Sequence, residues 1–177
     1  TVSSMSWSEG NDLSFGLALD HEAAEDITVN YSVGAPGTAD GGGVDYTDTG
    51  SGAAMITAGE TTGAITVHLE TDDIVEIDET FTVTLGSLTS SFGTDVQLGT
   101  ATVATGTITN TTVSELVILD VTVSEAESNV SFTLGLSNQV DADVTVSLTT
   151  QNGSATAGND YVARTGDVVF DSANPIG

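Results

Sequence analysis

The chain has 177 residues, of which 26 are acidic and only one, Arg164, is basic, so its formal net charge is −25 at pH 7. Nucleic acids and anionic membrane surfaces are excluded as partners, because both are bound through clustered lysine and arginine. Cysteine is absent, which excludes disulfides and thiol chemistry, and no apolar run is long enough to insert into a membrane.

The first part of the chain alternates apolar and polar residues. From Ile27 to Val33, Ile, Val, Tyr and Val fall on one face of an extended chain, and Thr, Asn and Ser fall on the other. This period is typical of β-strands with one buried face. The fold class is therefore all-β, and short strands at this spacing favour an immunoglobulin-like antiparallel β-sandwich. We expect strands near residues 2–8, 13–19, 27–33, 52–56, 63–70, 80–86 and 99–109.

The second part of the chain repeats the first. The pattern of Ser8–Phe15 returns at Ser124–Phe132, and Gly37-Thr38-Ala39 with the later Asp45-Tyr46 returns as Gly153-Ser154-Ala155 with Asp160-Tyr161. Self-similarity at one period indicates tandem modules. We predict a complete first module over residues 1–110 and a truncated second module, its N-terminal half only, over residues 111–177.

The second module is expected to contain four strands, near residues 116–124, 130–137, 144–150 and 165–170. Half a sandwich leaves unpaired strand edges and uncovered apolar faces. Two interpretations follow. The chain is a piece of a longer protein that completes the module itself, or a neighbouring chain supplies the remaining strands by complementation. We favour the first.

Acidic residues are predicted to meet at one end of the first module. If each strand crosses the sandwich, the end of the first strand lies beside the loops that follow the third and fifth strands. Glu9, Asp45 and the acidic segment 71–79 occupy these places. Carboxylates held together need protons or a cation, and oxygen donors without His or Cys favour Ca²⁺ over Mg²⁺. The alternative is a hydrophilic turn with solvated acids.

The ordered set of Glu9, Gly37-Thr38-Ala39, Asp45-Tyr46 and the segment Asp72–Phe81 resembles the Calx-β domain. That family includes calcium-sensing domains of sodium/calcium exchangers and repeat modules of extracellular adhesion proteins. The resemblance implies calcium ligands at Glu9, Asp45, Asp72, Asp73, Glu76 and Glu79, with Glu125 and Asp160 as the matching pair in the second module. Thr71 and residues 108–111 lack acids that the strongest binders carry, so we expect one or two ions bound at ~10⁻⁴–10⁻³ M.

We therefore predict a calcium-binding structural or adhesive repeat module of a secreted or cell-surface protein, with Ca²⁺ as its only cofactor. Its partners would be neighbouring modules or subunits of the same protein, including a homo-oligomer. One alternative is the subunit of an extracellular fibre assembled by strand complementation, and another is the calcium sensor of a transporter. An enzyme is not expected, because the chain is poor in aromatic residues and has no insertion that would form a substrate cleft.

Overall fold

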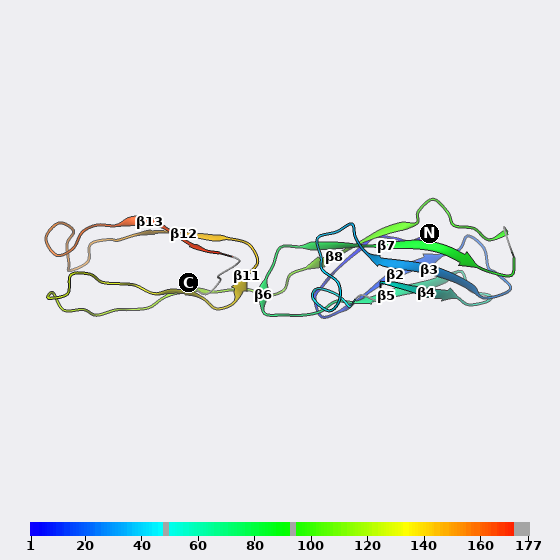
Figure 1. Cartoon of the computed structure of the whole chain (residues 1–177), viewed down its shortest axis with the longest axis horizontal. Coiled ribbons are helices and arrows are strands. Elements are labelled where there is room, and N and C mark those ends of the chain that lie inside the picture. The colour runs from blue at the N-terminus through cyan, green and yellow to red at the C-terminus, as the bar shows by residue number, and fades with distance from the viewer. Residues whose placement is uncertain (48–49, 93–94, 172–177) are drawn as a thin grey trace. The chain divides into compact units, whose positions relative to one another are not determined.

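The computed structural model describes residues 1–47, 50–92 and 95–171, and this part of the chain is built of β-strands without an α-helix (Figure 1). Within it, no helix is present that could cross a lipid bilayer. The chain forms two compact units: unit 1 is Thr1–Asp72 with Asp78–Thr111, and unit 2 is Asp73–Ile77 with Thr112–Gly177. The division of the sequence into modules 1–110 and 111–177 thus differs from these units at residues 73–77 and at Thr111.

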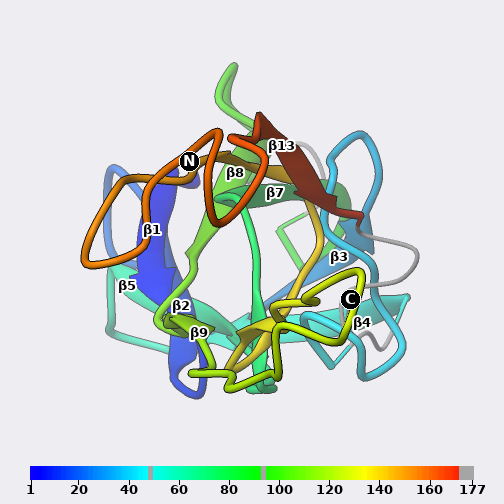
Figure 2. The same cartoon turned by 90° about the vertical axis from the view of Figure 1, so that its left-hand side faces the viewer.

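Unit 1 contains seven strands in two sheets. They are β1 (Met5–Ser8), β2 (Asp12–Ala18), β3 (Ile27–Gly34), β4 (Ser51–Ile56), β5 (Thr62–His68), β7 (Glu79–Thr89) and β8 (Val103–Thr109). The larger sheet has the order β1-β8-β7-β3-β4, and the smaller sheet pairs β2 with β5. In the end-on view of Figure 2, β2 and β5 lie on a different side of the core from β7 and β8.

The predicted immunoglobulin-like β-sandwich is confirmed, and in the described residues of unit 1 one strand pair departs from antiparallel pairing. Strand β1 runs parallel to β8, with Met5 opposite Gly106. The reason lies at the start of the chain, where Val2 forms an antiparallel bridge with Leu17 of β2. The N-terminal segment therefore contacts the smaller sheet first and then joins the edge of the larger sheet.

The alternation in the sequence gives the core of unit 1. Leu13, Phe15 and Leu17 of β2 are almost fully buried, and Phe15 meets Phe81 of β7 edge to face, with ring centroids 5.9 Å apart. Burying one such side chain stabilises a fold by about 1.5–3 kcal/mol. The smaller sheet is thus attached to the larger one through a continuous apolar layer.

The described residues of unit 2 form three two-stranded sheets. Its strands are β6 (Ile74–Val75), β9 (Leu116–Ile118), β10 (Leu134–Leu136), β11 (Gln139–Val140), β12 (Val144–Thr149) and β13 (Thr165–Phe170). Strands β9 and β10 pair antiparallel, as do β12 and β13, whereas β6 and β11 pair parallel. The predicted strands at 116–124 and 130–137 are therefore shorter than expected, and β6 and β11 were not predicted.

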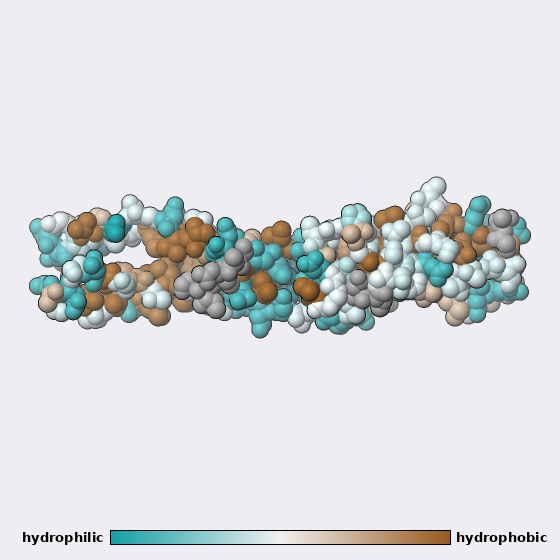
Figure 3. Space-filling view, viewed as in Figure 1, coloured by the Kyte–Doolittle hydropathy of each residue, from teal (hydrophilic) through white to brown (hydrophobic). Residues whose placement is uncertain are grey.

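Much of the apolar surface of unit 2 is uncovered. Large hydrophobic side chains are exposed both around the β9–β10 pair and around the β12–β13 pair. Figure 3 shows brown residues along these two parts of the unit, with an open gap between them. The exposed residues include Leu116, Val117, Ile118, Leu119, Val130, Phe132 and Val169. Among the described residues of this unit, only Val140 and Phe170 are buried hydrophobics.

Candidate functional site

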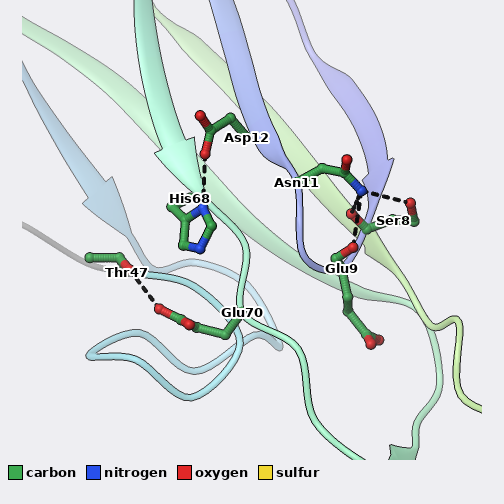
Figure 4. A network of polar contacts seen from close by, with 7 residues as sticks. All are labelled: Ser8, Glu9, Asn11, Asp12, Thr47, His68 and Glu70. Carbon is green, nitrogen blue, oxygen red and sulfur yellow. Dashed lines mark hydrogen bonds and ion pairs between the residues drawn. The ribbon is translucent and has the colours of Figure 1, made fainter.

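Backbone hydrogen bonds join three loops at one end of unit 1. Gly10 N, in the turn between β1 and β2, donates to Glu70 O over 3.2 Å, and Glu70 N donates to Asp45 O over 2.9 Å. The Thr47 hydroxyl also donates to Glu70 Oε1, at 2.6 Å (Figure 4). Glu9 N donates to Thr109 O at the end of β8. The ends of β1, β5 and β8 and the loop before β4 therefore meet, as the alternating path of the strands predicts.

Glu9 is the most unusual side chain at this end. It is only 9% exposed, its Oε2 atom accepts a 3.5 Å hydrogen bond from the Thr111 hydroxyl, and its buried Oε1 atom has no hydrogen-bond partner. Burial raises the pKa of Glu9 above its usual value, and the negative charges of Asp72 and Asp45 raise it further. Hydrogen bonds from Thr111 act in the opposite direction. The site thus holds a carboxylate oxygen that is desolvated and unpaired.

Asp45 is held in place by a hydrogen bond to its own carboxylate and by the buried residue that follows it. Its Oδ2 atom accepts a hydrogen bond from Asp40 N, which closes the loop between β3 and β4, and the side chain is 9% exposed. The next residue, Tyr46, is buried with its ring stacked on Phe81 at a centroid distance of 4.5 Å. The repeated Asp-Tyr pair therefore combines a core anchor with a carboxylate at the end of the sandwich.

The Gly37-Thr38-Ala39 motif fastens the same loop to β7. Thr38 N and Ala39 N both donate to Thr80 O, and Thr80 N donates back to the Thr38 hydroxyl. A Cβ atom on Gly37 would lie 2.1 Å from Thr80 O, so only glycine allows this close approach. The motif thus supports Asp45 without contributing a ligand.

The acidic segment after β5 is divided between the two units. Asp72 belongs to unit 1, where its charge acts on Glu9, and Glu79 begins β7 in a half-buried position. Asp73 and Glu76 lie in the segment 73–77, which clusters with unit 2 and contains β6. Of the predicted ligands in the first module, the structure brings Asp72 and Asp45 within electrostatic range of Glu9.

The matching acids of the second module occupy equivalent places in the chain. Asp160 Oδ2 accepts hydrogen bonds from the backbone N and the hydroxyl of Thr156, whereas Asp45 Oδ2 accepts one from the backbone N of Asp40. Tyr161 is only half-buried, and its hydroxyl donates to Asn152. Glu125 lies in an exposed stretch without strand structure. The loop that presents Asp160 is therefore formed, whereas the buried setting that Glu9 has in unit 1 is not formed around Glu125.

The donors at this end of unit 1 fit a hard cation in type. They are carboxylate and hydroxyl oxygens, and one buried carboxylate oxygen lacks a donor, which a cation would satisfy. These side chains do not form a complete metal site. Among the described residues, no three His, Asp or Glu side chains lie close enough together to hold a metal ion. An ion would have to draw the Asp72 and Asp45 side chains toward Glu9.

Three contributors to this end were missed by the sequence reasoning. Glu70 links two loops through its backbone, Thr111 contacts Glu9, and the Asn11 side chain donates to Ser8 O and Glu9 O. Asn11 lies next to Glu9 in the first turn, and Thr111 follows the end of β8. Their positions in the sequence could therefore have identified them as neighbours of the site. A nearby pair, His68 with Asp12 at 2.8 Å, is exposed and separate from Glu9 (Figure 4).

Comparison with known domains settles the family. The sequence matches the Calx-beta domain twice, over residues 12–112 and 109–175. The chain belongs to the Calx-beta domain family. No curated protein sequence matches it.

Solved structures agree with this assignment of fold. The Calx-beta chain is similar to the calcium binding domain CBD12 of CALX1.1, with a TM-score of 0.51 and 19% identity over 94% of this chain and 67% of that one. CBD12 from CALX1.2 has a TM-score of 0.51 and 18% identity over 99% and 70% of the two chains. The apo-form Calx CBD1 domain has a TM-score of 0.50 and 20% identity over 62% and 90%. At such identities the likeness concerns the fold.

Proposed function

We propose that this Calx-beta chain is a non-catalytic, calcium-binding structural repeat module of a secreted or cell-surface protein. Ca²⁺ binds at the end of unit 1 that carries Glu9, Asp45 and Asp72, draws these side chains together, and links the loops that they occupy. The observation that carries the proposal is the buried Oε1 atom of Glu9, which has no hydrogen-bond donor. A desolvated carboxylate beside two further carboxylates is stabilised by a divalent cation.

Composition supports the same function. A chain with a net charge of −25 repels itself, and bound cations reduce this repulsion. The absence of cysteine means that stability outside the cell must come from other sources, of which a metal ion is one. The partners of such tandem Calx-beta modules, each with a charged, oxygen-rich end, would be neighbouring modules or subunits of the same protein.

Thermal melting in chelator and in calcium tests the proposal. Fluorescence of Trp7, the single tryptophan, reports on unit 1 because it lies in β1, two residues before Glu9. Calcium at tenfold its dissociation constant stabilises the folded state by roughly 1.4 kcal/mol, and we expect the melting temperature to rise by several degrees. Magnesium at the same concentration is the control and should give a smaller shift. Identical curves in chelator and calcium would contradict calcium binding.

The second candidate is a calcium sensor of a transporter, which the likeness to CBD12 of CALX1.1 favours. Affinity separates the two candidates. Structural modules outside cells bind calcium at ~10⁻⁴–10⁻³ M, whereas intracellular sensors bind at ~10⁻⁷–10⁻⁵ M. Calorimetric titration of the whole chain should give a value in the weaker range, and micromolar binding would favour the sensor.

A further inference from the structure

His68 lies on the outer face of the smaller sheet of unit 1, beside two carboxylates. Leu69, the next residue, is completely buried, so His68 and Glu70 on either side of it both face away from the core. Across the β2–β5 pair, His68 is opposite Asp12. An imidazole ring and carboxylates from two different strands therefore share one face of the sheet.

The Asp12 carboxylate orients the His68 ring. Its Oδ1 atom lies 2.8 Å from Nδ1 of the ring. An ionised carboxylate only accepts hydrogen bonds, so Nδ1 carries the proton and Nε2 of the neutral ring keeps its lone pair. In metal sites a ligating histidine donates its other ring N–H to a carboxylate or a carbonyl in the same way. His68 is thus oriented as a metal ligand is, with Asp12 as the residue that fixes its ring.

Thr47 holds Glu70 on the same face. Its backbone N donates to His68 O over 2.9 Å, and its hydroxyl donates to Glu70 Oε1 over 2.6 Å. Figure 4 shows the His68 ring between Asp12 and Glu70, with its second nitrogen on the side of Glu70. Within the described part of the chain, neither His68 Nε2 nor Glu70 Oε2 makes a hydrogen bond. Both atoms are therefore available to a ligand.

We infer that His68 Nε2 and the Glu70 carboxylate bind a divalent transition metal, Cu²⁺ most strongly, and that Asp12 positions His68 for this role. Imidazole suits copper, zinc and nickel, whereas calcium and magnesium prefer oxygen ligands. Affinity for such nitrogen and oxygen donors reaches its maximum at Cu²⁺. Water fills the remaining positions, since no third metal-binding side chain of the described residues joins these two. The site differs from the calcium site at Glu9 in its ligands and in its metal.

The other histidine provides a comparison within the same chain. His21 follows Asp20 in the segment between β2 and β3, and its Nδ1 atom is 3.5 Å from Asp20 Oδ1. The two side chains are 89% and 93% exposed, and no strand fixes the ring. Both histidines thus have an acidic neighbour, but of the two only His68 is held on a sheet by a short hydrogen bond.

Copper titration of the intact chain tests the site. Electron paramagnetic resonance distinguishes Cu²⁺ bound by nitrogen from Cu²⁺ bound by oxygen alone, and we expect a saturable, nitrogen-ligated signal. His68→Gln should remove this signal, whereas His21→Gln should leave it unchanged. Because the His68 side chain is 53% exposed, its replacement should not change the melting temperature of the chain. Zn²⁺ should compete for the site, and excess Ca²⁺ should not.

The positioning role of Asp12 has its own readout. Nitrogen magnetic resonance of the His68 ring reports which ring nitrogen carries the proton. In the metal-free chain Nδ1 should carry it, and Asp12→Ala should give a mixture of the two forms. Copper binding should weaken about tenfold in the same variant, which is the usual effect of losing an outer-shell partner. An unchanged ring together with unchanged affinity would show that Asp12 does not position His68.

The remaining outcomes decide the ligand set. Glu70→Gln should weaken copper binding by roughly tenfold or more, since a ligand contributes at least as much as an outer-shell partner. Copper affinity that this change leaves intact would reduce the site to a single histidine and overturn the inference. A nitrogen-ligated signal that survives His68→Gln, or that His21→Gln abolishes, would overturn it as well. Calcium takes no part in these measurements, so their failure and the failure of the proposed function are distinguishable.

Discussion

Glu9 is held in a setting that disfavours its charged form. The side chain is nearly buried, one carboxylate oxygen has no donor, and the charges of Asp72 and Asp45 act on it. The charged form of a group in this setting destabilises the folded protein, and either a proton or a bound cation removes this cost. In the proposed calcium site, Glu9 would therefore connect ion binding to the stability of unit 1.

Replacing Glu9 separates these two effects. Glu9→Gln removes the buried charge and keeps the shape, so the melting temperature in chelator should rise by a few degrees. The same change removes a ligand, so the increase on adding calcium should shrink or disappear. Glu60→Gln, an exposed residue away from this end, is the control and should alter neither value. A calcium response that survives Glu9→Gln unchanged would exclude this residue from the site.

The raised pKa of Glu9 also predicts a pH dependence of the calcium-free chain. Between the ordinary pKa near 4.5 and the raised value in the folded state, the folded protein binds more protons than the unfolded one. Stability from this group is therefore lost as the pH rises through that window. Chemical denaturation at several pH values in chelator should show this slope, and Glu9→Gln should reduce it. Equal slopes for both proteins would show that Glu9 does not contribute.

Among the elements, the loop between β3 and β4 does most to position the site. Its start is fixed to β7 by Gly37, Thr38 and Ala39, and its end is fixed in the core by Tyr46. Asp45 lies between these anchors, and its carboxylate closes the loop by accepting a hydrogen bond from Asp40 N. The motif that repeats in the second module is therefore a structural support as much as a ligand signature.

Gly37→Ala tests this support. The added methyl group would collide with the backbone of Thr80, which is not a flexible side chain, so the free energy of unfolding should fall by about 1–3 kcal/mol. Calcium binding should weaken in parallel because Asp45 is displaced. Gly16→Ala in β2 is the matched control, since a Cβ there meets nothing within 4 Å. A Gly37 variant as stable as the Gly16 variant would contradict the role of the motif.

Which elements can be predicted from the sequence depends on what lies beside them. The alternation from Ile27 to Val33 predicts a strand, and β3 forms there because its partner strands β4 and β7 are both present. The alternation at residues 130–137 is as clear, yet only Leu134–Leu136 form a strand, because the pattern records which face would be buried and not whether a partner is there. The parallel β1 and the two-residue β6 depend on pairing between distant segments, which a local pattern does not contain. The same holds for Glu70, which takes part through its backbone.

For the whole molecule, the repeat produces two units that differ in how complete their apolar layers are. Unit 1 has a closed core with Phe15 and Phe81 at its centre, and the acidic end is built on this core. The described part of unit 2 has the Asp160 loop and three strand pairs, and most of its large apolar residues are exposed. The calcium proposal therefore belongs to unit 1.

Calcium titration followed by nuclear magnetic resonance of backbone amides tests the central claim most directly, because it reports both binding and location. Saturable shifts should appear at Gly10, Asp45, Glu70 and Thr111, while Gly59 at the β4–β5 turn should be unaffected. Half-saturation is expected at ~10⁻⁴–10⁻³ M. No saturable shift up to about 10 mM, tenfold above that range, or shifts centred away from Glu9, would contradict the account.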